Sequence, residues 1–154
     1  MPTTVTYGLL GRLVEVYTAG LPSDILVVDG DIVTGDIGTV LMVGWDDPDN
    51  DRATSVTSQQ SWAGLGAKSR DEEGTVTCLV VVTNGNGDLK EARDTVRAVT
   101  DAVEGIHRAD PNLGGEVPGL MWTGYGTRTE IRQWLSTEGA VVTCTFEIAF
   151  KARI

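Results

Sequence analysis

Thr75-Val76-Thr77-Cys78-Leu79-Val80-Val81-Val82 begins as an alternation of polar and apolar residues and ends as an unbroken apolar run. Such a run is typical of a strand that is covered on both faces. Asn84-Gly85-Asn86-Gly87 then predicts a tight turn, because glycine and asparagine tolerate the positive φ that such turns need. The rest of the chain is organised around this strand and the helix that follows it.

A long amphipathic helix is predicted from Asp88 to His107. The Asp88 carboxylate is suited to accept from free backbone N–H groups, and Glu91 lies three residues later, as in a capping box. Apolar residues recur at steps of three and four, at Leu89, Ala92, Val96, Val99, Val103 and Ile106. The opposite face is charged. We therefore expect the helix to lie on a sheet with its other side towards water or a partner.

Length and composition indicate one globular domain. The chain has 154 residues, of which 41% are hydrophobic and 22% charged, so general disorder is not expected. Many of the 19 glycines fall between apolar runs, which favours a sheet-rich fold with several turns. Cys78 and Cys144 lie in strand-like runs outside any CxxC pair, and we expect buried free thiols.

The strongly acidic charge limits the partners. A net charge of −10 argues against a nucleic-acid-binding surface and against adhesion to anionic membranes. It is compatible with solubility alone, and also with a passage that DNA crosses without sticking. The chain begins without a signal-peptide pattern and no apolar run approaches ~18 residues, so we expect neither a secreted nor a membrane protein.

The remaining elements predict an α+β fold. A first helix is expected over Thr4 to Ala19 on the spacing of Tyr7, Leu10, Leu13, Val14 and Tyr17. Further strands are expected at Ile25–Val28, Val40–Trp45, Thr54–Trp62, Gly119–Tyr125, Arg128–Leu135 and Ala140–Phe150. The order α-β-β-β-β-α-β-β-β predicts a mixed, mostly antiparallel sheet packed by two helices. Residues 54–83 form a long hairpin arm in this prediction.

No motif predicts a catalytic, cofactor or metal site. Asp47, Asp49 and Asp51 have the spacing of a calcium loop, but Arg52 and Ser58 stand where an EF-hand needs Gly and Glu. We interpret Asp46–Asp51 as a solvated loop, and a small metal-dependent enzyme using it is a distant alternative. His107 has no nucleophile or acid that points to it in sequence, and the Gly-rich turns match no phosphate-binding fingerprint.

The hairpin arm is the candidate interaction surface. Among the four tryptophans, Trp62 is the best candidate for an interface anchor, because the polar Gln59-Gln60-Ser61 before it is a poor lead into a core. The segment mixes apolar residues with charges of both signs, which suits contacts between identical neighbours. We expect a subunit or tube interface formed by Gln60, Trp62, Leu65, Lys68, Arg70, Asp71 and Glu72. The alternative is an ordinary hairpin with a mobile tip and no partner.

Several stretches resemble the tail terminator proteins of long-tailed, siphovirus-type phages of actinobacteria. The most specific stretch is Gln60-Ser61-Trp62-Ala63-Gly64-Leu65-Gly66-Ala67, followed by Arg70-Asp71-Glu72 and the strand at Val76 and Cys78. The similarity also covers Tyr7-Gly8-Leu9-Leu10, Val43-Gly44-Trp45-Asp46-Asp47, Ala92-Arg93-Asp94, Arg108-Ala109-Asp110-Pro111 and Phe146 to Ile154. It thus extends over nearly the whole chain, residues 1–154, as a single tail-terminator-like domain.

This resemblance implies a structural protein without enzymatic activity. The family's small α+β subunit closes into a hexameric ring that caps the finished tail tube, stops tube polymerisation and presents a surface to the head-completion or neck protein. DNA passes through its lumen without specific binding. The implied location is the virion, at the top of the tail, and the host cytoplasm during assembly. Another phage neck or tail component, such as a head-completion or tube protein, is the alternative.

Overall fold

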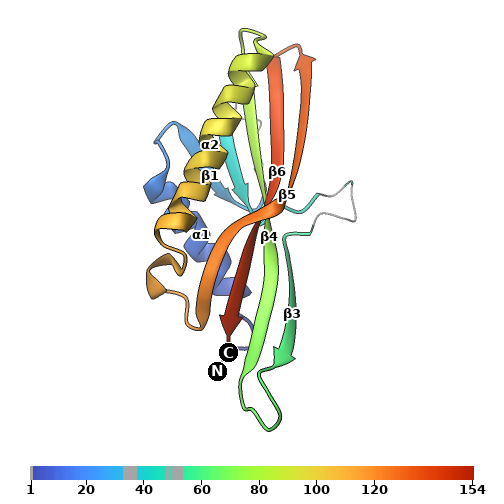
Figure 1. The fold of residues 1–154 in the computed structure, drawn as a ribbon. Helices are drawn as coiled ribbons and strands as arrows, with labels where there is room; N and C mark the ends of the chain where they lie inside the picture. Colours follow the sequence, from blue (N-terminus) through green and yellow to red (C-terminus); the bar gives the residue numbers. More distant parts are fainter. Residues whose placement is uncertain (1, 33–37, 48, 50–53) are drawn as a thin grey trace.

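The computed structural model describes residues 2–32, 38–47, 49 and 54–154. It shows an elongated sheet with two helices on one of its faces (Figure 1), which confirms the predicted α+β class. The elements are α1 (Thr6–Gly20), β1 (Ile25–Asp29), β2 (Thr39–Val43), β3 (Val56–Trp62), β4 (Arg70–Asn84), α2 (Leu89–Ala109), the 3₁₀ turn η1 (Leu113–Gly115), β5 (Leu120–Ser136) and β6 (Gly139–Arg153).

The sheet is built around β4. Its strand order is β1-β2-β4-β6-β5, and β3 pairs with β4 outside this path. One edge of β4 is shared, because β2 pairs with residues 78–82 and β3 with residues 70–76. The other edge pairs with β6 over residues 71–84. Among the described strands, only β1 and β2 are parallel neighbours, so the sheet is mixed and mostly antiparallel, as predicted.

The two segments expected as separate strands after α2 form one strand, β5. The pairing with β6 shifts register between Tyr125 and Thr129, which is an irregularity of the bulge type. A Cβ at Gly126 would lie 2.8 Å from the carbonyl oxygen of Glu147, so only glycine fits this close approach. The apparent break at Gly126 in the sequence is therefore a bend within a continuous strand.

The central helix matches its prediction closely. Asp88 is the N-cap and its side chain accepts from the backbone N–H of Glu91 at 3.1 Å. The buried face is formed by Ala92, Val96, Val99, Val103 and His107, and Ile106 is partly buried. This face packs on β4, β5 and β6, and places α2 along one half of the sheet (Figure 1).

The first helix is rotated relative to its prediction. Tyr7 was expected on the apolar face, but it is 80% exposed, and Leu10 is only partly buried. Leu13 and Tyr17 are fully buried, as predicted, and the unpredicted Val5 and Leu9 complete a buried row at steps of four. The helix begins at Thr6 rather than Thr4, because Thr4 and the Val5 N–H are hydrogen-bonded to β4.

Both faces of β4 are covered near its middle, as its apolar run predicts. Val80 and Val82 join the main core under the helices, whereas Leu79 packs with Val40 and Met42 on the other face, which we call the helix-free face. In β6 the alternation is confirmed, because Val142, Cys144, Phe146, Ile148 and Phe150 are all buried. Cys78 and Cys144 are buried free thiols.

Truncating Phe146 to alanine is predicted to lower the free energy of unfolding by about 3–5 kcal/mol. The ring is fully buried and stacks on Tyr125 with centroids 5.1 Å apart. Urea unfolding measures the change. Ile131→Ala is the matched control, since Ile131 is 58% exposed on the neighbouring strand and should change stability by less than about 0.5 kcal/mol. Equal stability of Phe146→Ala and wild type would contradict this core.

Candidate interaction surface

The β3–β4 hairpin projects beyond the helices as an arm. We define the arm as residues 56–76, in which β3 pairs with the first half of β4. The tip, residues 63–69, lies at one end of the molecule near the chain termini (Figure 1). A Cβ on Gly74 would overlap the carbonyl oxygen of Thr57, so glycine allows the two strands to approach closely there. No described residue pairs with the outer edge of β3.

The arm carries its apolar side chains in the open. Trp62 is 68% exposed and Leu65 is fully exposed, and the guanidinium of Arg70 lies over the Trp62 ring at 5.9 Å from its centroid. Such a contact is a cation–π interaction. Gln60 and Lys68 are also exposed, and the Gln60 side chain donates to the carbonyl oxygen of Thr3 at 2.7 Å. These five members of the predicted interface lie at or near the tip.

Glu72 does not belong to the surface, and its inclusion in the predicted interface is corrected here. The side chain is fully buried, and its carboxylate accepts from the Thr4 hydroxyl, from the Val5 N–H at 3.0 Å and from the Ser58 hydroxyl at 2.9 Å. Val5 is the N-cap of α1, so the carboxylate also lies at the positive end of that helix. In the sequence, Glu72 lies in a charged run that gives no sign of burial. Its role as a buried acceptor becomes visible only when β4 is seen beside the start of α1.

The environment of Glu72 keeps it ionised. Burial on its own raises the pKa of this carboxyl, but the hydrogen bonds from Thr4, Val5 and Ser58, together with Gln60, outweigh it. The pKa of Glu72 therefore lies below its ordinary value. A carboxylate held in this way joins the N-terminus of α1 to the base of the arm.

The remaining acids of the arm are paired within the subunit. Asp71 accepts from Arg153 at 2.7 and 3.1 Å, and this hydrogen bonding lowers the pKa of Asp71. The Glu73 carboxylate lies 2.8 Å from the ammonium of Lys151, which is on β6 like Arg153. Residues 62–70 contain Lys68 and Arg70 and no acidic residue. The tip together with its two flanking residues is therefore basic in a chain whose net charge is −10.

A groove opens on the helix-free face, in the half of the sheet that does not carry the arm. Its volume is about 240 Å³, and Trp45, Leu79 and Trp134 form its apolar walls. Its polar lining comes from Asp47, Thr77, Arg128, Glu130, Arg132, Thr143, Thr145 and Glu147. Arg132 donates to Glu130 at 3.0 and 3.1 Å. Sequence reasoning missed this groove, although the alternation Arg128, Glu130, Arg132, Trp134 could have indicated a polar strand face.

His107 is part of a buried hydrogen-bonded chain. Its Nε2 lies 2.6 Å from the Tyr17 hydroxyl, and its Nδ1 lies 2.6 Å from Thr123 Oγ1, which donates to the carbonyl of Pro111. Since the Thr123 proton is used there, Nδ1–H donates to Thr123 and Tyr17 donates to Nε2. Burial lowers the pKa of His107 to about 4, so the ring is neutral and fixes α1 against α2.

Other site types receive no support within the described part of the chain. No cluster of three or more metal-ligating side chains is found there, and Asp51 of the predicted acidic loop lies outside the described residues. Every buried side-chain nitrogen and oxygen atom among residues with described placement has a partner. None of the described helices is long and apolar enough to cross a membrane.

Comparisons with known proteins identify the fold and no family. Neither a family model nor a curated protein matches the chain. Among solved structures, the chain is similar to a chain from the "Virion of native gene transfer agent (GTA) particle", with a TM-score of 0.54 and 12% identity. The match covers 99% of this chain and 100% of that one. At this identity the likeness shows a shared fold, and that fold occurs in a virion component.

Replacing Glu72 with alanine is predicted to lower the free energy of unfolding by at least about 2 kcal/mol, because it leaves several donors without their charged acceptor. Chemical unfolding at neutral pH measures this. Glu73→Ala is the matched control, since it removes only an exposed ion pair and should leave the midpoint nearly unchanged. Equal midpoints for the two variants would contradict the anchoring role of Glu72.

Stability is predicted to fall between neutral pH and pH 4 because of His107. Its pKa is lower in the folded state than its ordinary value of 6.5, so the unfolded chain binds the proton first as pH falls. At pH 5 the loss relative to pH 7 is about 2 kcal/mol from this group. His107→Gln should lose this part of the pH dependence in urea titrations. If the stability of the variant depends on pH as steeply as that of the wild type, the claim that His107 is buried as a neutral imidazole is contradicted.

Proposed function

We propose that this chain is a structural subunit of a phage-type virion that acts as a tail terminator. In this proposal, copies of the chain close into a hexameric ring on the finished tail tube of a siphovirus-type particle from an actinobacterial host. The ring stops tube polymerisation and forms the surface to which the head-completion or neck protein joins. Two observations support it: the full-length likeness in fold to a virion chain, and the sequence motifs that resemble tail terminators.

The arm is the observation that carries the proposal. It is a hairpin with an unpaired outer edge among the described residues, and it holds Trp62 and Leu65 in the open. Exposed strand edges and large exposed apolar side chains favour contacts with other chains, and tryptophan is enriched among interface anchors.

The position of the sheet edges fits a ring. In the half of the sheet that carries the arm, the order is β3-β4-β6-β5, so β3 and β5 form its opposite edges. Contacts between different edges of neighbouring copies are heterologous, and such contacts generate rings when the rotation closes. The sheet thus offers two different surfaces for one type of repeated contact.

The charge of the chain fits a passage for DNA. A net charge of −10 disfavours tight phosphate contacts, and DNA can then move through the lumen without specific binding. In this proposal the protein is located at the neck of the virion and is assembled in the host cytoplasm.

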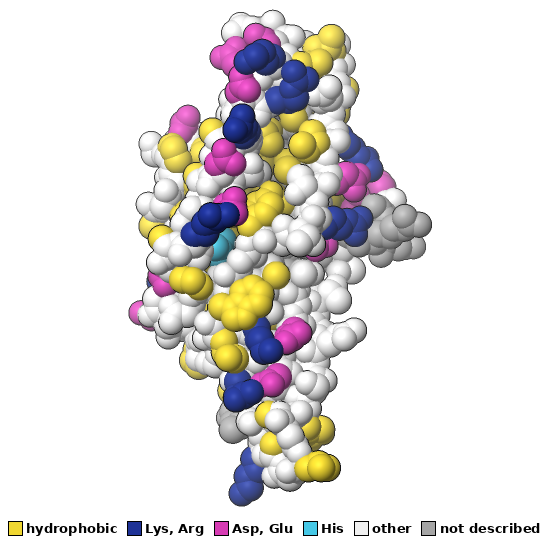
Figure 2. Space-filling view, viewed as in Figure 1, with side chains coloured by type: hydrophobic (Ala, Val, Ile, Leu, Met, Phe, Trp, Pro, Cys, Tyr) yellow, Lys and Arg dark blue, Asp and Glu magenta, His cyan; other side chains and the backbone are white. Residues whose placement is uncertain are grey.

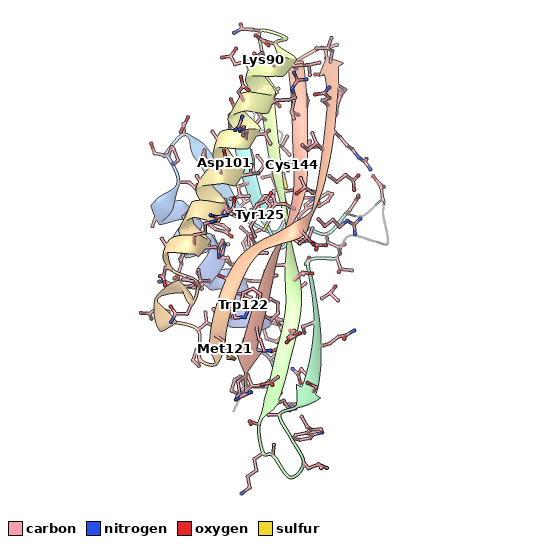
Figure 3. All side chains as sticks on the ribbon, viewed as in Figure 1. Lys90, Asp101, Met121, Trp122, Tyr125 and Cys144 are labelled. Atoms are coloured by element: carbon pink, nitrogen blue, oxygen red, sulfur yellow. The ribbon has the colours of Figure 1, made fainter. Side chains whose placement is uncertain are left out.

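The test is a Trp62→Ala, Arg70→Ala double variant. We expect it to fold normally by circular dichroism and to fail in capping, so that electron microscopy shows tails of unequal length or tails without heads. Tyr7→Ala, Arg97→Ala is the matched control, because both side chains are exposed on the helices, away from the arm and from the part of β5 that carries Trp122 (Figure 3). It should give normal particles.

Two results would contradict the proposal. One is a folded double variant that still yields tails of uniform length with heads attached. The other is binding of the wild-type protein to head portals and not to tube ends, which would instead identify a head-completion component.

A further inference from the structure

We infer that the groove on the helix-free face is the receptor for the arm of a neighbouring copy of this chain. The inference rests on the proposed ring and names its contact. Trp62 is the anchor that enters the groove between Trp45 and Trp134, and Lys68 and Arg70 lie against the carboxylates of the groove lining.

The size and lining of the groove fit a side chain better than a cofactor. About 240 Å³ is smaller than the roughly 300–1,000 Å³ typical of small-molecule sites. Thr145 is paired with Leu79 on one side and with Glu130 on the other, so the groove runs across β4, β6 and β5. An aromatic anchor seated in a pocket and surrounded by a polar rim is the usual form of an interface hot spot.

The charges of the two surfaces are complementary. Residues 62–70 carry two cations and no acid, while the groove is lined by Asp47, Glu130 and Glu147 against two arginines, Arg128 and Arg132. On the face shown in Figure 2, the end of the arm has yellow and dark blue side chains and no magenta ones. The groove lining has one carboxylate more than it has guanidinium groups, and this small acidic excess favours a basic segment as its occupant.

The arm of a given copy cannot enter its own groove. Arg70, next to the tip, is seven positions along extended β4 from Thr77 at the near side of the groove, which corresponds to roughly 23 Å. The tip also points away from this half of the sheet (Figure 1). The occupant therefore comes from another copy, and contacts of arm to groove repeat in one direction around the ring.

The test uses variants of each surface alone and in mixture, with oligomers measured by sedimentation velocity over a range of concentrations. Trp62→Ala disables the arm, while Thr145→Trp fills the groove and Trp134→Ala removes one of its walls. Each variant that folds should self-associate at least about tenfold more weakly than wild type. Tyr7→Ala, which removes an exposed aromatic ring of α1 outside both the arm and the groove lining, is the matched control and should assemble as wild type does.

The mixture gives the sharpest outcome. Trp62→Ala retains a working groove and Thr145→Trp retains a working arm, so one intact contact forms per pair of copies. We expect dimers in the mixture and no closed rings. If Thr145→Trp does not fold, Trp134→Ala takes its place in the mixture.

The contradicting outcomes separate this inference from the proposed function. If the folded groove variants assemble as wild type does, the inference alone is contradicted. If these variants form intact rings but no longer bind the tail tube, the inference alone is again contradicted, and the groove would be assigned to the tube protein. A wild-type chain that stays monomeric up to millimolar concentration also contradicts the inference. Rings that depend on arm and groove but do not cap tubes contradict the tail terminator function alone.

Discussion

The pairing of β4 with β6, from Asp71–Arg153 to Asn84–Ala140, is the constraint on which the rest of the structure depends. These two strands are long enough to run through both halves of the sheet. In one half they lie under α2 and beside β2, and in the other they carry β3 as an arm. Because the ladder is continuous, the arm is held in a fixed direction relative to the core.

The base of the arm is secured by two different interactions. Glu72 joins β4 to the start of α1 from the buried side, and the ion pairs of Asp71 and Glu73 with β6 hold the solvent side. The buried carboxylate carries most of this stabilisation, since exposed ion pairs contribute little. Beyond this base, Arg70 exchanges backbone hydrogen bonds with Ile154, whereas the side chains of Trp62 and Leu65 stay exposed at the end of the arm.

Local patterns were sufficient to predict the central elements. The apolar run at Thr75–Val82 and the alternation in Ala140–Phe150 indicated the two core strands, and Asp88 marked the start of α2 correctly. These predictions succeeded because the side-chain period alone determines which face is buried. The exposed Trp62 and Leu65 were also indicated by their polar surroundings.

The missed features depend on contacts between distant residues. The start of α1 and the anchoring of Glu72 both involve the hydrogen bond between Val5 and Glu72, which no local pattern contains. The continuity of β5 depends on Gly126 fitting against Glu147, and the groove requires three strands to meet. In each case the deciding partner lies many residues away in the sequence.

The central claim is that the exposed arm becomes buried when copies of this chain assemble. A cryo-electron microscopy structure of the assembled protein, alone or on a tail tube, tests it most directly. We predict a closed ring in which Trp62, 68% exposed in the single subunit, is buried against the adjacent copy. An assembled particle in which Trp62 remains open to solvent would contradict the account.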